Sequence, residues 1–146
     1  MNPIPSAETA AWNGAEGSRN GQPVLLRYRP ELEMFLGDAR YPRRLTITWT
    51  YRCDNSSGMP SEQQSDELGE FEGLLQAHLD ADGTAILAFV RTHAGNRRWT
   101  YYIADAQLVS QRIKTALADH PNLPIEFEAE DDPEWTALRT ILERCK

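Results

Sequence analysis

Apolar and polar residues alternate most regularly in residues 43–52, RRLTITWTYR. Leu45, Ile47 and Trp49 fall on one side of an extended segment, and the threonines between them fall on the other. A period of two with β-branched and aromatic residues is typical of a strand with one buried face. Shorter stretches of the same character predict further strands at residues 23–29, 85–92, 97–104 and 125–130.

Helical spacing of apolar residues predicts three helices. In residues 61–80, apolar positions recur every three or four residues from Leu68 to Leu79, and Ser61 with Gln64 can form a capping box at the start. Asp105 can cap a second helix, and Asp132 can cap a third, with a proline at its first helical position. The predicted order of elements is β-β-α-β-β-α-β-α.

The order of elements predicts an α+β fold. Without the first strand and the last helix it reads β-α-β-β-α-β, the split βαβ or ferredoxin-like pattern, in which an antiparallel sheet carries helices on one face. Residues 22–146 then form a single domain with an extra N-terminal strand and a C-terminal helix. Residues 1–21 are rich in Ala, Gly, Asn, Pro and Ser, and we expect a flexible N-terminal arm that Trp12 can anchor.

The aromatic strand at residues 97–104, RRWTYYIA, allows two interpretations. RNA-recognition modules share the order β-α-β-β-α-β and stack bases on aromatic residues of this strand, where Trp99 and Tyr101 stand here. Neighbouring residues face opposite sides of a strand, so exposing these rings would turn Arg98 and Thr100 into the core. Burying Trp99 and Tyr101 instead gives one continuous apolar face, and we expect that arrangement.

The same alternation predicts which residues decorate the other, open face of the sheet. Glu126, Glu128 and Glu130 of the last strand belong to that face. The face could accept an acidic peptide, a carboxylate ligand or a second copy of the chain, or it could be a solvated surface whose arginines pair with the glutamates. The candidate binding residues are Arg27, Arg29, Arg44, Arg52, Arg98 and Tyr102.

Charge and composition narrow the classes of partner. The net charge is −7, which disfavours nucleic acid and an anionic membrane surface as ligands. No apolar run approaches the length of a membrane span, and the N-terminus does not read as a secretion signal. Two widely spaced cysteines are too few for a disulfide scaffold, so we expect a cytoplasmic protein.

Motifs for catalysis or cofactor binding are missing from the sequence. The three histidines fall in separate predicted elements, and there is no HExxH, no GxSxG and no glycine-rich phosphate loop. We therefore expect no catalytic residue, no metal ligand and no cofactor. Two alternatives stay open: Cys53 as a nucleophile, and the acidic stretch 126–134 as a site for a divalent cation.

Three segments in order, residues 58–75, 91–105 and 131–142, carry a family resemblance. Their most specific parts are a Gly-x-Pro-Ser helix entry, an Arg-x-aromatic-x-Tyr-Tyr strand and an Asp-Pro-x-Trp helix start. Together they resemble the bacterial domain-of-unknown-function 695 family from about residue 23 onward, and this family is partly similar to the B-type regulators of ribonuclease E activity. The resemblance implies a βαββαβ-like fold and a regulatory, partner-binding role, and it supplies no established catalytic residue to carry over.

Three functions follow as expectations. The first is a non-enzymatic binding or regulatory module that contacts another protein. The second is an RNA-binding protein that uses the arginines of the open face. The third is an enzyme acting on a small substrate through Cys53 or the acidic stretch. Dimerisation through the open face or an edge strand is compatible with each of them.

Overall fold

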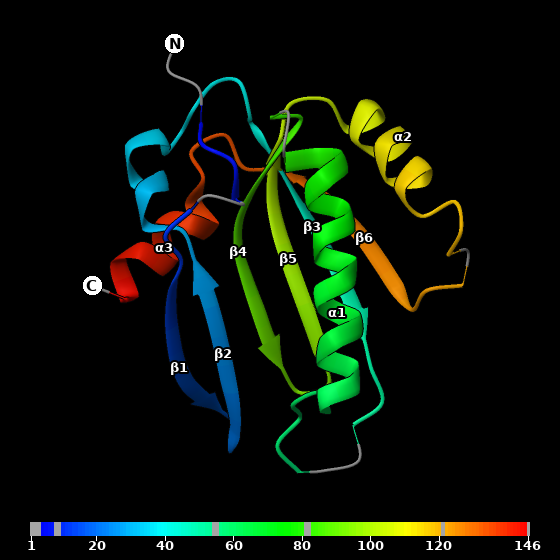
Figure 1. Cartoon of the computed structure of the whole chain (residues 1–146). Coiled ribbons are helices and arrows are strands. Elements are labelled where there is room, and N and C mark those ends of the chain that lie inside the picture. Colours follow the sequence, from blue (N-terminus) through cyan, green and yellow to red (C-terminus); the bar gives the residue numbers. More distant parts are fainter. Residues whose placement is uncertain (1–3, 8–9, 54–55, 81–82, 121, 146) are drawn as a thin grey trace.

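A six-stranded antiparallel sheet forms the centre of an α+β fold, in the strand order β1-β2-β4-β5-β3-β6 (Figure 1). The computed structural model describes residues 4–7, 10–53, 56–80, 83–120 and 122–145. The strands are β1 (Asn13–Arg19), β2 (Gln22–Tyr28), β3 (Arg43–Thr50), β4 (Ala85–His93), β5 (Asn96–Ile103) and β6 (Ile125–Asp131). The helices are α1 (Glu62–Leu75), α2 (Ala106–Ala116) and α3 (Thr136–Arg144), with a 3-10 helix η2 (Pro30–Phe35) and a π-helix η3 (Gln76–Asp80).

The first hydrophobic core lies between the sheet and the helices α1 and α2. Trp99 and Tyr101 are fully buried in it, which confirms that the aromatic side of β5 faces inward. Phe71 of α1 packs between two tryptophans, with ring centroids 5.1 Å from Trp49 and 5.0 Å from Trp99. The predicted capping box of Ser61 and Gln64 is present at the start of α1.

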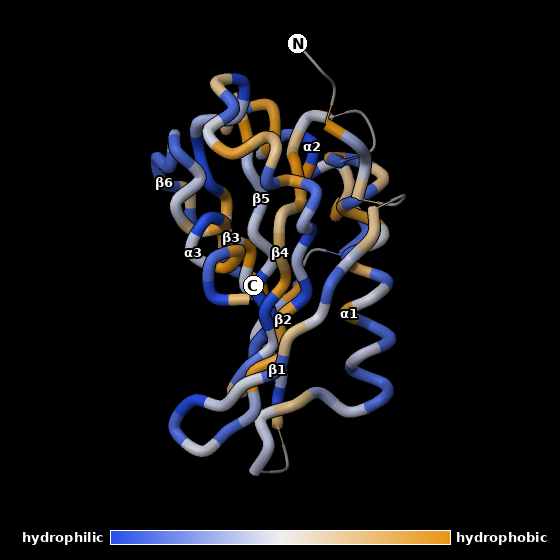
Figure 2. The backbone as a smooth tube through the Cα atoms, turned by 90° about the vertical axis from the view of Figure 1, so that its left-hand side faces the viewer, coloured by the Kyte–Doolittle hydropathy of each residue, from blue (hydrophilic) through white to orange (hydrophobic). Residues whose placement is uncertain are grey.

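A second core lies on the opposite face, under α3 and η2. Helices therefore cover both faces of the sheet, which corrects the prediction of helices on one face; Figure 2 shows α1 and α3 on opposite sides. The reason lies in β4, where six consecutive residues from Ala85 to Val90 are all buried. A strand that is apolar on both sides is covered on both sides, and Ile86 and Tyr102 pack against Trp135 and Leu138.

The segment before residue 22 contains a strand that the sequence analysis did not predict. Residues Asn13–Arg19 form β1, which pairs with β2 through a two-residue turn at Asn20 and Gly21. Both turn residues have positive φ, 56° and 79°, as a type I′ hairpin turn requires. β1 escaped prediction because nearly all of it is exposed and it lacks an apolar side. The flexible-arm behaviour of residues 1–21 stays a prediction.

The hairpin turns and α3 lie toward opposite ends of the sheet. In Figure 1 the β1–β2 and β4–β5 turns share the lower end, while α3 lies toward the upper end. The second face is therefore covered at one end and open at the other. In the described part of the chain, no helix is long and apolar enough to cross a membrane.

Candidate functional site

Two of the predicted binding arginines, Arg27 and Arg29, lie on the face covered by α1 and η3. Arg27 forms a 2.6 Å ion pair with Glu72 of α1. Arg29 is fully buried, and its guanidinium lies 3.7 Å from the carboxylate of Asp80. This corrects their assignment to the open face. The alternation in β2 was misleading because the strand buries Tyr28 on the other side, against the second core.

A third predicted residue, Arg52, lies outside the sheet. β3 ends at Thr50, and the carbonyl of Arg52 accepts a hydrogen bond of 2.7 Å from the Gln64 side chain. The residue borders a cleft of about 510 Å³ that also includes Trp49 and Phe71. Arg52 therefore belongs to the junction of β3 and α1 and not to the open face.

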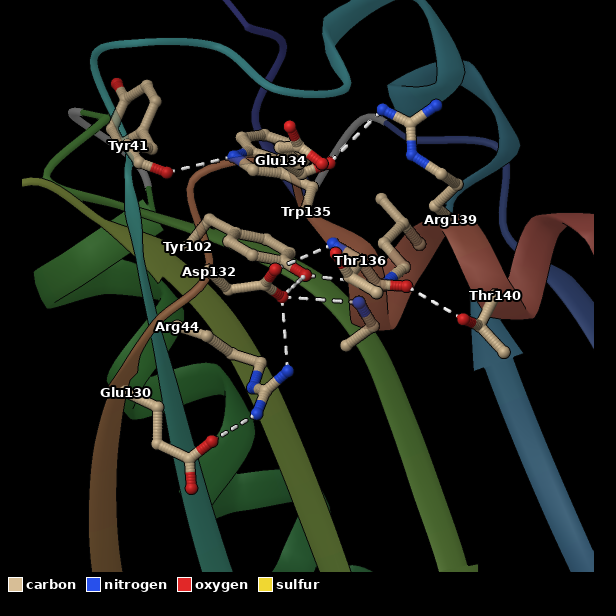
Figure 3. A network of polar contacts seen from close by, with 12 residues as sticks. Tyr41, Arg44, Tyr102, Glu130, Asp132, Glu134, Trp135, Thr136, Arg139 and Thr140 are labelled. Carbon is tan, nitrogen blue, oxygen red and sulfur yellow. Dashed lines mark hydrogen bonds and ion pairs between the residues drawn. The ribbon is translucent and has the colours of Figure 1, made fainter.

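Arg44 and Tyr102 do lie on the second face, where both bind Asp132 (Figure 3). The Tyr102 hydroxyl donates to the Asp132 carboxylate at 2.9 Å, and the Arg44 guanidinium donates to it at 3.1 Å. Arg44 also forms an ion pair of 2.6 Å with Glu130 on the neighbouring strand. The predicted pairing of arginine with a glutamate across strands is thus present at this position.

Asp132 also holds the start of α3. Its two carboxylate oxygens accept hydrogen bonds from the backbone N–H groups of Thr136, at 2.7 Å, and Ala137, at 3.2 Å. Burial acts to raise the pKa of Asp132, but these N–H groups, the Tyr102 hydroxyl and the Arg44 charge together hold it below its usual value. The helix begins three residues later than predicted, at Thr136, and Trp135 stands at its N-cap position, so the prediction of Asp132 as the N-cap is wrong. Asp132 nevertheless accepts hydrogen bonds from the first two N–H groups of the helix.

Trp135 completes this covered end of the face. Its ring stacks on Tyr102 with centroids 4.2 Å apart and planes within 4° of parallel, and its indole N–H donates to the carbonyl of Tyr41 at 2.9 Å (Figure 3). Trp135 adopts a left-handed backbone conformation with φ of 57°. The Asp-Pro-x-Trp sequence is therefore a structural motif that fastens α3 to the sheet, and Tyr102 is buried beneath it.

Arg98 is the one predicted arginine that is exposed on the open end of the second face, and two arginines that were not predicted accompany it. Arg98 on β5 lies directly opposite Arg91 on β4 in the register of the two strands. Arg19, the last residue of β1, lines the same hollow of about 260 Å³. We call Arg19, Arg91 and Arg98 the arginine cluster.

The arginine cluster carries unbalanced positive charge. Among the residues that the structure describes, no carboxylate forms an ion pair with any of the three. Partial burial lowers the pKa of Arg91, and the neighbouring charges of Arg19 and Arg98 lower it further. Like charges directly opposite each other on adjacent strands destabilise a sheet, so the arrangement opposes folding and favours an anion in the hollow.

Polar residues complete the lining of the hollow, namely Asn20, His93 and Asn96. The Nδ1 atom of His93 lies 3.1 Å from the carbonyl oxygen of Pro23. A carbonyl oxygen can only accept, so Nδ1 carries the hydrogen and donates it. This bond fixes the orientation of the ring beside the cluster.

Sequence reasoning missed Arg19 and Arg91 for two different reasons. Arg19 fell within the segment that was interpreted as an arm. The expected β4–β5 connection at residues 93–96 gives the same register as the observed loop of Ala94 and Gly95, with Arg91 opposite Arg98. Arg91 was missed because β4 is buried on both sides from Ala85 to Val90, so its sequence pattern did not assign a face to it. The Asn-Gly turn after Arg19 was a signal for the first hairpin, and the expected β4–β5 hairpin was a signal for the pairing of Arg91 with Arg98.

The acidic stretch and Cys53 were the two alternatives for metal or thiol chemistry. Within these ranges no group of three or more His, Cys, Asp or Glu side chains could hold a metal ion. Neither Cys53 nor Cys145 takes part in a disulfide among the described residues, and both are partly buried. The Cys53 thiol lies 3.6 Å from the carbonyl oxygen of Met59, and Cys53 does not line the cleft of about 510 Å³.

Comparison with known proteins identifies a family. The family of unknown function (DUF695) matches residues 10–142. The chain belongs to this family. The matched range contains β1 and the whole arginine cluster, so the first hairpin is part of the family domain. No curated protein and no solved structure matches the chain.

Proposed function

We propose that this DUF695 protein is a non-enzymatic binding module that holds an acidic segment of a partner protein against the arginine cluster. The observation that carries the proposal is the direct cross-strand pairing of Arg91 and Arg98, with Arg19 beside them and no carboxylate paired to them in the described residues. Natural sequences break a local stability rule mainly at functional sites. Planar guanidinium groups suit carboxylates because they can donate two parallel hydrogen bonds.

An acidic protein segment fits this face better than RNA does. Phosphate backbones need an extended basic track, and single-stranded bases need exposed aromatic rings. The row of residues that contains Arg98 continues through Thr48 to Glu126 on β6, so negative charge follows within two strands. Tyr102, the aromatic residue nearest to a stacking position, is buried. RNA would extend beyond the hollow over the rest of the surface. The net charge of −7 repels such a polyanion.

The same proposal includes the ferredoxin-like fold and the cellular location. In the sheet order β4-β5-β3-β6, α1 and α2 each connect two strands that have one strand between them, which supports a ferredoxin-like βαββαβ unit extended by β1 and β2. We propose a regulatory role in the cytoplasm. The lack of a disulfide between the cysteines of the described residues is compatible with a reducing compartment.

Titration with a short peptide of alternating glutamate and serine tests the proposal. At low ionic strength we expect binding that weakens as salt is added, because exposed charges are screened. Arg98→Gln or Arg91→Gln removes one charge-assisted contact and should weaken the peptide about tenfold, which corresponds to ~1.4 kcal/mol. Isothermal titration calorimetry measures both effects.

Arg144→Gln provides the matched control, since it removes the same charge from an exposed position at the end of α3. A peptide in which glutamine replaces glutamate should not bind. The proposal fails if Arg98→Gln and Arg144→Gln bind the glutamate peptide equally well. If oligouridine binds the protein more tightly than the peptide and loses affinity in Arg98→Gln, the face binds RNA instead.

A further inference from the structure

β6 ends the sheet, and one of its two edges has no strand partner in the described chain. The order of the sheet places β3 on its other side, in a register that pairs Arg43 with Asp131 and Trp49 with Ile125. Figure 1 shows β6 below α2 at the right-hand margin of the sheet. An edge strand presents unpaired backbone N–H and C=O groups, which can hydrogen-bond to an extended segment of another chain.

An apolar groove runs beside this edge, between β6 and α2. Its volume is about 320 Å³, and Phe127 forms one wall while 48% of its surface is exposed. The other apolar residues that line it are Leu45, Ile103, Ala106, Val109, Ile113 and Ala129, and the polar lining residues are Ser110 and Lys114. α2 therefore leaves β6 uncovered on the helix side. A large aromatic side chain exposed at a strand edge is an unfavourable surface for an isolated protein.

The opposite side of β6 is acidic. Glu126, Glu128 and Glu130 alternate with Phe127 and Ala129, so the carboxylates face away from the groove. Arg44 pairs with Glu130, but Glu126 and Glu128 have no ion pair among the residues that the structure describes. The edge of β6 thus offers apolar contacts on one side and negative charge on the other.

We propose that the edge of β6 is a second docking site, which adds an extended segment of a partner protein in which basic and apolar residues alternate. The basic side chains of the added strand lie beside Glu126 and Glu128, and its apolar side chains cover Phe127 and enter the groove. Strand addition of this kind takes its affinity from backbone hydrogen bonds and its specificity from alternate side chains. The site is separate from the arginine cluster and goes beyond the proposed function, because it selects a segment of opposite charge.

A second copy of the chain fits this edge poorly. Pairing β6 with another β6 would place the glutamates of the two strands beside each other, and like charges opposite each other destabilise a sheet. The other outer strand, β1, is a weaker candidate. It contains Gly14 and Gly17, which give an added strand no side chains to pack against.

Amide hydrogen exchange and calorimetry with a short acetylated peptide of alternating lysine and valine test this inference on the full chain. We expect slower exchange in β6 when the peptide binds. The double variant Glu126→Lys with Glu128→Lys should weaken binding by about tenfold or more, because two favourable cross-strand charge pairs become repulsive. Phe127→Thr puts a β-branched residue, which suits a strand, in place of the aromatic ring, and it should weaken binding at high salt as well as at low salt.

The matched control is Glu134→Lys with Glu143→Lys, which makes the same change of charge at exposed positions near α3. The inference is overturned if both double variants bind the peptide equally, if exchange slows in another element, or if a glutamate-valine peptide binds as tightly. A concentration-dependent dimer that protects β6 without any peptide would assign the edge to a second copy and overturn the choice of partner. Loss of lysine-valine binding in Arg98→Gln would show that the two sites are not separate.

Discussion

Arg44 and Arg98 lie on the same face of the same sheet, but their surroundings differ in charge. Arg44 contacts two carboxylates, Glu130 and Asp132, beneath the end of the sheet that α3 covers. Arg98 lies opposite another arginine at the open end, with no carboxylate paired to it among the described residues. Arginine therefore has two roles on this face. An arginine paired with carboxylates of its own chain stabilises the fold, while arginines without such a partner in the described residues are available to bind an anionic ligand.

The largest effect on stability should come from a substitution at the end of the sheet that α3 covers. Asp132→Ala removes the acceptor for two N–H groups of α3, the Tyr102 hydroxyl and the Arg44 guanidinium at once. We expect the free energy of unfolding to fall by about 3 kcal/mol, since the acceptor for the first N–H groups of α3 and a mostly buried ion pair are lost together. Urea denaturation measures this fall in the free energy of unfolding. Glu130→Ala, which removes the exposed partner of Arg44, should lower the free energy of unfolding by less than about 1 kcal/mol.

Tyr102→Phe should have a smaller effect on the same network. The substitution keeps the stack on Trp135 but removes the hydroxyl that donates to Asp132 and accepts from the N–H of Leu138. Loss of these hydrogen bonds should lower the free energy of unfolding by about 1–2 kcal/mol. An unchanged urea midpoint in Tyr102→Phe would show that Asp132 stabilises the covered end without the tyrosine.

Lowering the pH should reduce the difference in the free energy of unfolding between wild type and Asp132→Ala. The pKa of Asp132 is lowered in the folded protein, so this carboxylate binds its proton less readily there than in the unfolded chain. Its contribution is fully present above the unfolded pKa, about 3.9, and is lost as the pH falls through the lower folded value. Urea denaturation of both proteins as the pH is lowered from neutral should show the two free energies converging only below about pH 4. If the difference between the two free energies of unfolding stays constant below about pH 4, the ionised carboxylate of Asp132 is not the group that stabilises this end of the sheet.

The smallest effect, opposite in sign, should come from the open end. Arg98→Thr matches Thr48 and Thr100 on the same face and removes the repulsion of Arg91. We expect the protein to become more stable by about 0.5 kcal/mol, while its affinity for the glutamate peptide falls. A substitution that stabilises the fold and weakens binding is the expected behaviour of a functional residue. Destabilisation by Arg98→Thr would instead place this arginine with Arg44 as a structural residue.

Elements with one buried side could be predicted from the sequence, and elements with two could not. The alternation in β3 indicated its inward residues correctly, and the caps Ser61 and Asp105 mark the starts of α1 and α2 as expected. In β2 and β4 both sides are at least partly buried, so a period of two no longer shows which side faces the helices. Arg27 and Arg29 were therefore assigned to the wrong face.

The candidate site was predicted only in part for a related reason. The sequence indicated an arginine on the open face, and Arg98 is there. Its neighbours depend on two hairpin turns, at Asn20–Gly21 and Ala94–Gly95, that set which residues lie opposite each other. A change of one residue in either register would turn Arg19 or Arg91 to the other face. The Asp132 network depends on α3 reaching across the sheet, which local sequence patterns do not describe.

The most direct test of the account observes the arginine side chains themselves during a titration. Nitrogen-15 NMR resolves the Nε–H groups, and the glutamate peptide can be added in steps at low salt. The account predicts that the signals of Arg91 and Arg98 move with the peptide concentration and saturate together, while those of Arg44 and Arg29 stay in place. Shifts confined to Arg44, or no shift at Arg91 and Arg98 while the peptide binds, would contradict the claim that the unbalanced arginines form the binding site.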